Sequence, residues 1–167
     1  MPTSHPESRR WVAERVAELS PDTMLDVGAG AGTYADLLRP YVRHIEAVEI
    51  FRPYLTRFRL HAKYEQVHVG DVRTWQWPRR YGLVVCGDVL EHMAEDEAVD
   101  VHRQALDHAD AVLVVLPIVH WPQDGRDGNQ HEAHVSDWDH EKASAAFAPD
   151  VWWTGEYVGA YLTRSGR

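Results

Sequence analysis

Met24-Leu-Asp-Val-Gly-Ala-Gly-Ala-Gly-Thr-Tyr-Ala-Asp-Leu-Leu38 is the stretch that decides the fold of this chain. A short apolar run is followed by three glycines at alternate positions, Gly28, Gly30 and Gly32, and then by an amphipathic helical pattern. Glycine lets the backbone adopt positive φ and approach a ligand closely, and the first turn of a helix leaves N–H groups free to face that ligand. The stretch therefore predicts a strand, a tight turn and a helix that together bind a nucleoside-containing cofactor.

The spacing of the glycines distinguishes between cofactors. Dinucleotide-binding turns read G-x-G-x-x-G, with the pyrophosphate on the helix N-terminus. This turn reads G-x-G-x-G and has Thr33 where the last glycine of that fingerprint would fall. Asp26 lies just before the first glycine, where its carboxylate repels a phosphate but favours a ligand with an ammonium group. An adenosyl amino acid therefore fits this turn better than NAD.

The motif D-x-G-x-G-x-G resembles motif I of the class I S-adenosylmethionine-dependent methyltransferases, and the resemblance extends from Thr23 to Arg164. It implies an α/β fold, a doubly wound and mostly parallel seven-stranded sheet of order 3-2-1-4-5-7-6 with helices on both faces. It also implies that S-adenosylmethionine is the cofactor, that S-adenosylhomocysteine is the product, and that the enzyme is of the small-molecule type.

Alternating apolar runs and amphipathic stretches predict the elements of a parallel sheet with crossover helices. We expect strands over residues 23–27, 44–49, 66–69, 81–87 and 111–116, and helices over 32–39, 51–62, 94–109 and 137–147. The helix over 94–109 is expected to turn Val99, Val101, Ala105 and Leu106 inward. A hairpin within 150–164 closes the sheet. Ser136 with Asp139 is the expected cap of the helix before it.

We treat residues 1–167 as a single domain. Its first twenty residues are expected to form an N-terminal helix, which Ser4 and Glu7 begin with a capping box. Residues 117–136 form a long loop that leaves the carboxyl end of a strand. Loops of this length in compact domains usually carry function, so this one is predicted to lie on the substrate side.

Composition narrows the class of protein. The net charge of −9 has the wrong sign for a surface that tracks phosphates, which argues against a nucleic-acid partner. The single cysteine, Cys86, excludes an internal disulfide and a cysteine-based zinc site. No apolar run approaches the roughly twenty residues that span a bilayer, and residues 1–10 lack the apolar segment of a signal peptide. We therefore expect a cytoplasmic protein with no membrane partner.

The cofactor site is expected at the carboxyl ends of the first four strands. Glu49 lies about twenty positions after the first glycine, where an acid accepts hydrogen bonds from both ribose hydroxyls. By the family resemblance, Asp71 accepts from the adenine amino group, and the backbone that ends the fourth strand contacts the methionine moiety. The predicted cofactor-binding residues are Asp26, Gly28, Ala29, Gly30, Glu49, Ile50, Asp71, Val72, Gly87 and Asp88.

Two histidines are the candidate catalytic residues. The segment Asp88-Val-Leu-Glu-His-Met93 is similar to the segment after strand four in many small-molecule methyltransferases, where the acid and histidine lie on the substrate side. His92 leaves this strand and His120 leaves the next one, so both are candidates for a general base; a histidine pKa of about 6.5 suits proton removal from an acceptor hydroxyl. A purely structural role for each histidine stays open.

The long loop supplies the candidate substrate-binding residues: Trp121, Asn129, His131 and His134. The same region holds residue types that bind zinc or iron: His131, His134, His140, Asp137 and Asp139. Its H-E-x-H spacing is one residue short of H-E-x-x-H, so no metal is assigned. The acceptor is expected to be a small molecule, and a homodimer or a partner subunit that completes the pocket stays open.

Three alternatives remain. An NAD(P)-dependent oxidoreductase is disfavoured by Asp26 and by Thr33, which stands where the dinucleotide fingerprint has its last glycine. A methyltransferase-like subunit that is catalytically silent, or that acts only with a partner, would be favoured by an exposed apolar patch beside the loop. A nucleic-acid methyltransferase lacks its N/D-P-P-Y motif here, although the chain offers several arginines for contacts with phosphates: Arg52, Arg57, Arg59, Arg79 and Arg80.

Overall fold

A single seven-stranded sheet organises the computed structural model, which describes residues 4–166. Its order is β3-β2-β1-β4-β5-β7-β6. The strands are β1 Thr23–Val27, β2 His44–Glu49, β3 Gln66–Val69, β4 Leu83–Gly87, β5 Ala111–Pro117, β6 Val151–Thr154 and β7 Val158–Arg164. Strand β7 is antiparallel to both of its neighbours, and the other pairs are parallel. The predicted fold class and strand order are confirmed.

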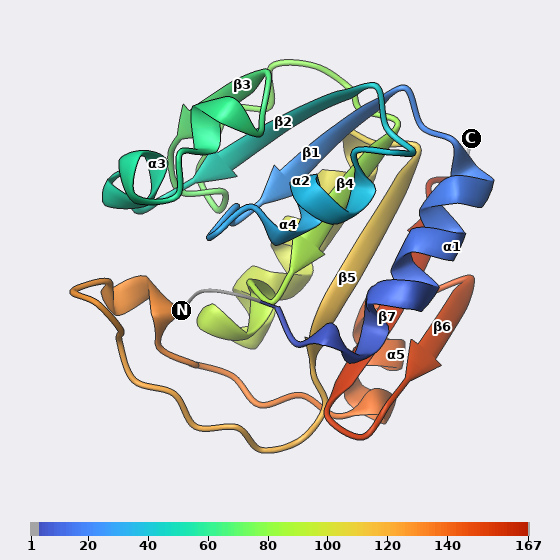
Figure 1. The fold of residues 1–167 in the computed structure, drawn as a ribbon. Helices are drawn as coiled ribbons and strands as arrows, with labels where there is room; N and C mark the ends of the chain where they lie inside the picture. Colours follow the sequence, from blue (N-terminus) through green and yellow to red (C-terminus); the bar gives the residue numbers. More distant parts are fainter. Residues whose placement is uncertain (1–3, 167) are drawn as a thin grey trace.

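Helices cover both faces of this sheet (Figure 1). One core cluster joins the sheet to α1 Arg9–Leu19, α2 Thr33–Leu38 and α3 Pro53–Arg57, and the other joins it to α4 Glu95–Asp107 and α5 His140–Phe147. Short 3-10 helices lie at η1 Pro6–Ser8, η2 Leu60–Ala62, η3 Leu90–His92 and η4 Gln130–Glu132. Strands β4 and β5 are apolar along almost their whole length because each is buried on both faces.

Two helix predictions need correction. The helix expected over 51–62 is broken, because Arg59 adopts a left-handed conformation (φ +52°) between α3 and η2. In α4 the buried face consists of Ala98, Val101, His102 and Ala105. Val99 is 37% exposed, so its predicted inward position is wrong. The buried residues of α4 recur every three or four positions, and Val99 does not fall on that face of the helix.

The expected caps also differ from the observed ones. Helix α5 begins at His140 and is capped by Asp139, whose side chain accepts from the Lys142 backbone N–H at 2.8 Å. Ser136 instead accepts from the Trp138 indole N–H at 2.9 Å. The indole needs a partner in its buried setting, so this competing bond moves the helix start toward the C-terminus.

Glu7 does not form the predicted capping box. Its carboxylate accepts hydrogen bonds from the backbone N–H groups of Glu156 (2.7 Å), Tyr157 (3.0 Å) and Val158 (3.3 Å), in the turn between β6 and β7. These bonds hold the pKa of Glu7 below its ordinary value. The residue therefore ties the N-terminal segment to the far end of the chain.

We expect Glu7→Gln to lower the thermal unfolding midpoint at pH 7, because an amide offers one acceptor oxygen where the carboxylate offers two. A lowered folded-state pKa contributes stability above the unfolded-state value that is lost as pH falls through the folded one. The midpoints of wild type and variant should therefore converge in acid. Thermal unfolding followed by circular dichroism between pH 3 and pH 8 measures this; a difference that persists unchanged in acid would contradict it.

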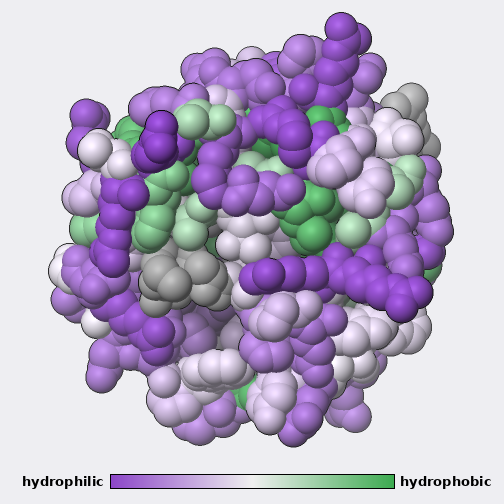
Figure 2. Space-filling view, viewed as in Figure 1, coloured by the Kyte–Doolittle hydropathy of each residue, from purple (hydrophilic) through white to green (hydrophobic). Residues whose placement is uncertain are grey.

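The surface seen in Figure 2 is mostly hydrophilic, with apolar residues in small groups between polar ones. Among the helices within residues 4–166, none combines the length and the apolarity needed to cross a membrane.

Candidate functional site

The cavity at the carboxyl ends of β1 and β4 lies where the strand order of the sheet reverses, and for this reason we call it the main cavity, although a hollow of about 680 Å³ lies at the amino ends of these strands. Open α/β sheets bind their ligands at such a switch point. The cavity has a volume of about 490 Å³, within the range of small-molecule sites. Its walls come from the glycine turn, the ends of β2 and β4, η3, the long loop and the N-terminal segment.

The glycine turn has the geometry that its sequence predicts. Gly28 and Gly32 adopt positive φ (+72° and +79°). A Cβ atom on Gly28 would lie 2.7 Å from Cγ2 of Val89, so only glycine fits against the wall of the cavity there. The predicted residues Gly28, Ala29 and Gly30 all line the cavity.

Glu49 lies at the end of β2 with its carboxylate against the glycine turn. Its oxygens accept from the backbone N–H groups of Gly30 (2.9 Å) and Phe51 (2.7 Å). Burial raises its pKa, and these two bonds act in the opposite direction. Each carboxylate oxygen keeps a second lone pair. Glu49 and Ile50 line the cavity, so a ligand can reach them.

Asp26 lies outside the cavity lining, although the sequence suggested direct contact with a ligand. Its side chain is 1% exposed, and Oδ2 accepts from the Tyr64 hydroxyl at 2.6 Å. Oδ1 has no hydrogen-bond partner within residues 4–166. Burial raises the pKa of Asp26 to about 7. The carboxyl group is therefore a buried titratable group beneath the turn.

Asp71 and Val72 line a second, smaller cavity of about 70 Å³, which shares Gly28, Ile50 and His92 with the main one. The Asp71 carboxylate has a protein partner that sequence reasoning missed. Arg73 donates to it through Nε (2.9 Å) and through its terminal nitrogen (2.6 Å), and also bonds Glu97. These bonds hold the pKa of Asp71 below its ordinary value.

The end of β4 presents a tight packing contact and two buried acids. A Cβ atom on Gly87 would lie 1.8 Å from the ring of Tyr34. Asp88 adopts positive φ (+52°). Burial raises the pKa of both Asp88 and Glu91, and the charge of Asp88 raises that of Glu91 further. Asp88 Oδ2 and Glu91 Oε2 have no hydrogen-bond partner in the described part of the chain.

His92 and His134 meet beside these acids, with ring centroids 4.9 Å apart. His92 lies on η3, and its Nδ1 is 3.1 Å from the carbonyl oxygen of Ala133. His134 comes from the long loop. Burial lowers the pKa of both imidazoles, and the hydrogen bond to Ala133 partly offsets this for His92. Both rings line the main cavity.

His120 is not brought to the cavity. Its side chain is 73% exposed and bonds Asp137 at 3.0 Å. His140 packs against Tyr161 and Trp152 instead of joining the other loop histidines. The residues that the sequence suggested as metal ligands, which include His131, Asp137 and Asp139, therefore do not come together. Within residues 4–166 a different group of metal-ligating side chains does: Glu91, His92 and His134.

The long loop forms part of the wall of the cavity, and its position on the substrate side stays a prediction. Trp121, Asn129, His131 and His134 all line the cavity. Asn129 is 2% exposed and shapes the loop, because its Oδ1 accepts from the His131 backbone N–H.

The loop docks on α3 through contacts that the sequence did not reveal. The Tyr54 hydroxyl donates to Glu132 (3.0 Å), and Arg57 forms an ion pair with Asp127 (3.0 Å). The pairs are far apart in the chain, and neither has a motif that marks it. Trp121 is 39% exposed and packs against Tyr157, which leaves a small apolar surface at the mouth of the cavity.

Comparisons with known proteins agree with this arrangement. A family model described as a methyltransferase domain matches residues 6–115. The ubiquinone biosynthesis O-methyltransferase of Aeromonas salmonicida (strain A449) is 25% identical over an alignment of 96 residues; the alignment covers 53% of this chain and 40% of that curated relative's length.

Solved structures share the fold at low sequence identity. An S-adenosylmethionine-dependent methyltransferase from Clostridium acetobutylicum ATCC 824 has a TM-score of 0.71 at 13% identity, over 95% of this chain and 91% of that one. CalS10 with bound S-adenosylmethionine, an amino pentose methyltransferase from Micromonospora echinaspora, has a TM-score of 0.66 at 19% identity, over 94% of this chain and 90% of that one.

Proposed function

Because the chain belongs to the methyltransferase domain family and has the class I fold of S-adenosylmethionine-dependent methyltransferases, we propose that it transfers a methyl group from S-adenosylmethionine to a hydroxyl or amine of a small molecule. The observation that carries this proposal is the charge of the main cavity. Its lining holds four acidic side chains against one arginine, Arg126, and the acids are Glu49, Asp88, Glu91 and Glu132.

This acid-rich cavity suits a cofactor with a cationic sulfonium and an ammonium group. A pyrophosphate in the same place would face several carboxylates at short range, which in a partly buried setting costs several kcal/mol. The residues present therefore fit S-adenosylmethionine and disfavour NAD(P). The glycine turn supports the same fit, because Gly28, Ala29 and Gly30 line the cavity and expose backbone with little side chain to a ligand.

We assign the cofactor contacts as follows. Glu49 accepts from the ribose hydroxyls with the lone pairs that its backbone bonds leave free. Asp71 and the Val72 backbone N–H hold the adenine edge in the smaller cavity. The backbone of Gly87 and Asp88 contacts the methionine moiety. Asp26 lies beneath the turn, and its negative charge attracts the ammonium group of the cofactor without direct contact.

We assign the acceptor to the part of the cavity that is lined by Glu91, His92, His134 and Trp121. S-Adenosylmethionine supplies a methyl group on a sulfonium that is its own leaving group. The protein's part is to place the acceptor in line and, for a hydroxyl, to remove its proton. One relative is named an O-methyltransferase and one structural neighbour an amino pentose methyltransferase, so we propose a small hydroxylated or amino-bearing acceptor.

Calorimetric titration with S-adenosylhomocysteine and, separately, with NAD tests the cofactor assignment. We expect saturable binding of S-adenosylhomocysteine alone. Glu49→Ala should weaken it roughly tenfold or more, as expected for the loss of charge-assisted hydrogen bonds.

Glu14→Ala is the matched control, because Glu14 pairs only with Arg10 on the exposed surface of α1 in the described chain. Its affinity should equal that of wild type. Heat with NAD and none with S-adenosylhomocysteine would overturn the proposal, and so would equal affinities of wild type and Glu49→Ala.

A further inference from the structure

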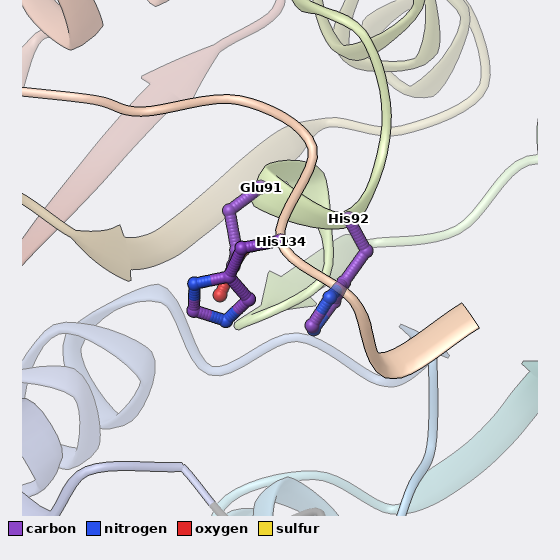
Figure 3. Close-up of side chains that lie close together, drawn as sticks. All are labelled: Glu91, His92 and His134. Atoms are coloured by element: carbon purple, nitrogen blue, oxygen red, sulfur yellow. The ribbon is translucent and has the colours of Figure 1, made fainter. Parts of the chain in front are cut away.

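Three side chains of metal-ligating type converge at the acceptor end of the cavity (Figure 3). Glu91 and His92 come from η3, and His134 comes from the long loop. Each offers one ligand atom, and these atoms all lie within 4.8 Å of one another. The sequence placed Glu91 beside His92 but gave no reason to associate them with His134.

The buried carboxylate of this cluster lacks a partner for one of its oxygens. Glu91 is 2% exposed, and its Oε2 accepts no hydrogen bond from any group in residues 4–166. A buried carboxylate without partners costs several kcal/mol. The neighbouring Asp88 has a second buried oxygen in the same condition. A cation between Glu91 and the imidazoles would compensate both charges.

His92 is oriented as a metal-ligating histidine is. Nδ1 of His92 faces the Ala133 carbonyl oxygen at 3.1 Å, so this nitrogen carries the proton and Nε2 carries the lone pair. Ligating histidines almost always make such a bond with the ring nitrogen that faces away from the metal. The carbonyl belongs to the residue next to His134, so the bond also joins η3 to the segment of the loop that carries His134.

Backbone bonds hold the loop against η3. The carbonyl oxygen of Glu91 accepts from the N–H groups of Val135 (2.8 Å) and Ser136 (3.1 Å). His134 is therefore fixed from both sides, by the bonds of the residues before and after it. The cluster is built by the fold and does not arise from exposed side chains that happen to meet.

We propose that Glu91, His92 and His134 bind one divalent transition-metal ion. Two imidazoles and one carboxylate form a ligand set of zinc and of non-haem iron sites, and three protein ligands leave a coordination position open. All three side chains line the main cavity, so an ion held by them would be accessible from it. Ligand atoms in a tetrahedral zinc site lie about 3.3 Å apart, so binding draws His134 toward η3 and tightens the loop.

The role of this metal rests on the proposed function, whereas metal binding itself does not. An acceptor hydroxyl that coordinates the ion loses its proton to water more readily, because the metal stabilises the oxyanion. The oxygen then forms a bond to the methyl carbon as the carbon–sulfur bond breaks, and that electron pair stays on sulfur. His92 acts as a ligand here and not as the general base.

Calorimetric titration of metal-stripped protein with Zn²⁺, beside the visible absorption of the Co²⁺-loaded protein, tests the site. We expect one high-affinity Zn²⁺ per chain and Co²⁺ bands of low-symmetry coordination. His92→Ala, His134→Ala and Glu91→Gln should each weaken Zn²⁺ binding at least tenfold. His120→Ala removes an exposed imidazole from the same loop and should leave Zn²⁺ binding unchanged.

S-Adenosylhomocysteine binding, measured on the same samples, distinguishes the two proposals. Variants that lose Zn²⁺ but keep S-adenosylhomocysteine are folded, so their loss reports on the metal site. Wild type that binds S-adenosylhomocysteine without saturable Zn²⁺ binding overturns the metal site alone. Wild type that binds Zn²⁺ but not S-adenosylhomocysteine overturns the proposed function alone. Equal Zn²⁺ affinity in wild type, His92→Ala and His134→Ala also refutes the metal site.

Discussion

Gly87→Ala is expected to destabilise the protein by about 3 kcal/mol, the upper end of the range for overpacked cores. Gly87 ends β4 beneath the ring of Tyr34, and a Cβ there would lie 1.8 Å from Cε2 and 2.5 Å from Cζ of that ring. Tyr34 is 4% exposed and packed within the core, so the ring has little room to move. Urea unfolding of both proteins gives the difference in the free energy of unfolding.

The same substitution should abolish cofactor binding, because Gly87 and Tyr34 both line the main cavity. Gly166→Ala is the control; a Cβ there meets nothing within 4 Å, and its stability should stay within about 0.5 kcal/mol of wild type.

A double-mutant cycle isolates the contact between the two residues. In a Tyr34→Ala background, Gly87→Ala should cost less than about 1 kcal/mol, because the atoms that it would overlap are gone. The same cost in both backgrounds would show that another part of the β4 terminus is responsible.

Asp26→Asn should stabilise the protein without ligand at pH 8 and weaken its affinity for S-adenosylhomocysteine. Burial raises the pKa of Asp26 from 3.8 to about 7. Between these values the folded state holds a proton that the unfolded state has lost, so the free energy of unfolding falls as pH rises through this window. The shift corresponds to at most ~4 kcal/mol at pH 8. Asparagine removes the ionisation and can still accept from the Tyr64 hydroxyl.

The stability difference should vanish near pH 4, where Asp26 is protonated in the folded state. The affinity loss, roughly tenfold at pH 8, reflects the missing negative charge beneath the ligand's ammonium group. Asp22→Asn is the control, because Asp22 is exposed just before β1. Urea unfolding at pH 4, 6 and 8 with calorimetry at pH 8 measures both effects. Equal stability at pH 8 would mean that Asp26 stays protonated there, and an unchanged affinity would exclude its role in binding.

A stability gain together with a binding loss is the pattern expected of a functional group kept at a cost to the fold. Gly87 shows the opposite case, in which packing and the cavity impose the same residue. The two predictions therefore separate a residue that the fold requires from one that the ligand requires.

Local patterns in the sequence predicted the strands, the crossover helices and the glycine turn, and the family resemblance supplied the strand order. Strand–turn–helix signals depend on periodicity and on glycine spacing over a few residues, which act locally. The apolar strands 83–87 and 111–117 and the two β-prone runs at the C-terminus are compatible with the observed order of strands in the sheet. The sequence separation of Gly28 and Glu49 also predicted that the acid lies at the cavity. Only one short helix, α2, connects β1 to β2, so this separation fixes where β2 ends.

Which side chains from distant segments meet depends on the tertiary structure. Glu7 reaches the β6–β7 turn, Tyr54 bonds Glu132, and His134 joins Glu91 and His92, although no short motif links these segments. Burial likewise decided that Asp26 lies beneath the turn and that His120 remains in solvent. Such contacts depend on how distant segments pack, and packing is set by the whole core and by backbone bonds such as those that hold the loop on η3. The local pattern specifies elements and their order; the convergence of side chains from different elements is a property of the folded chain.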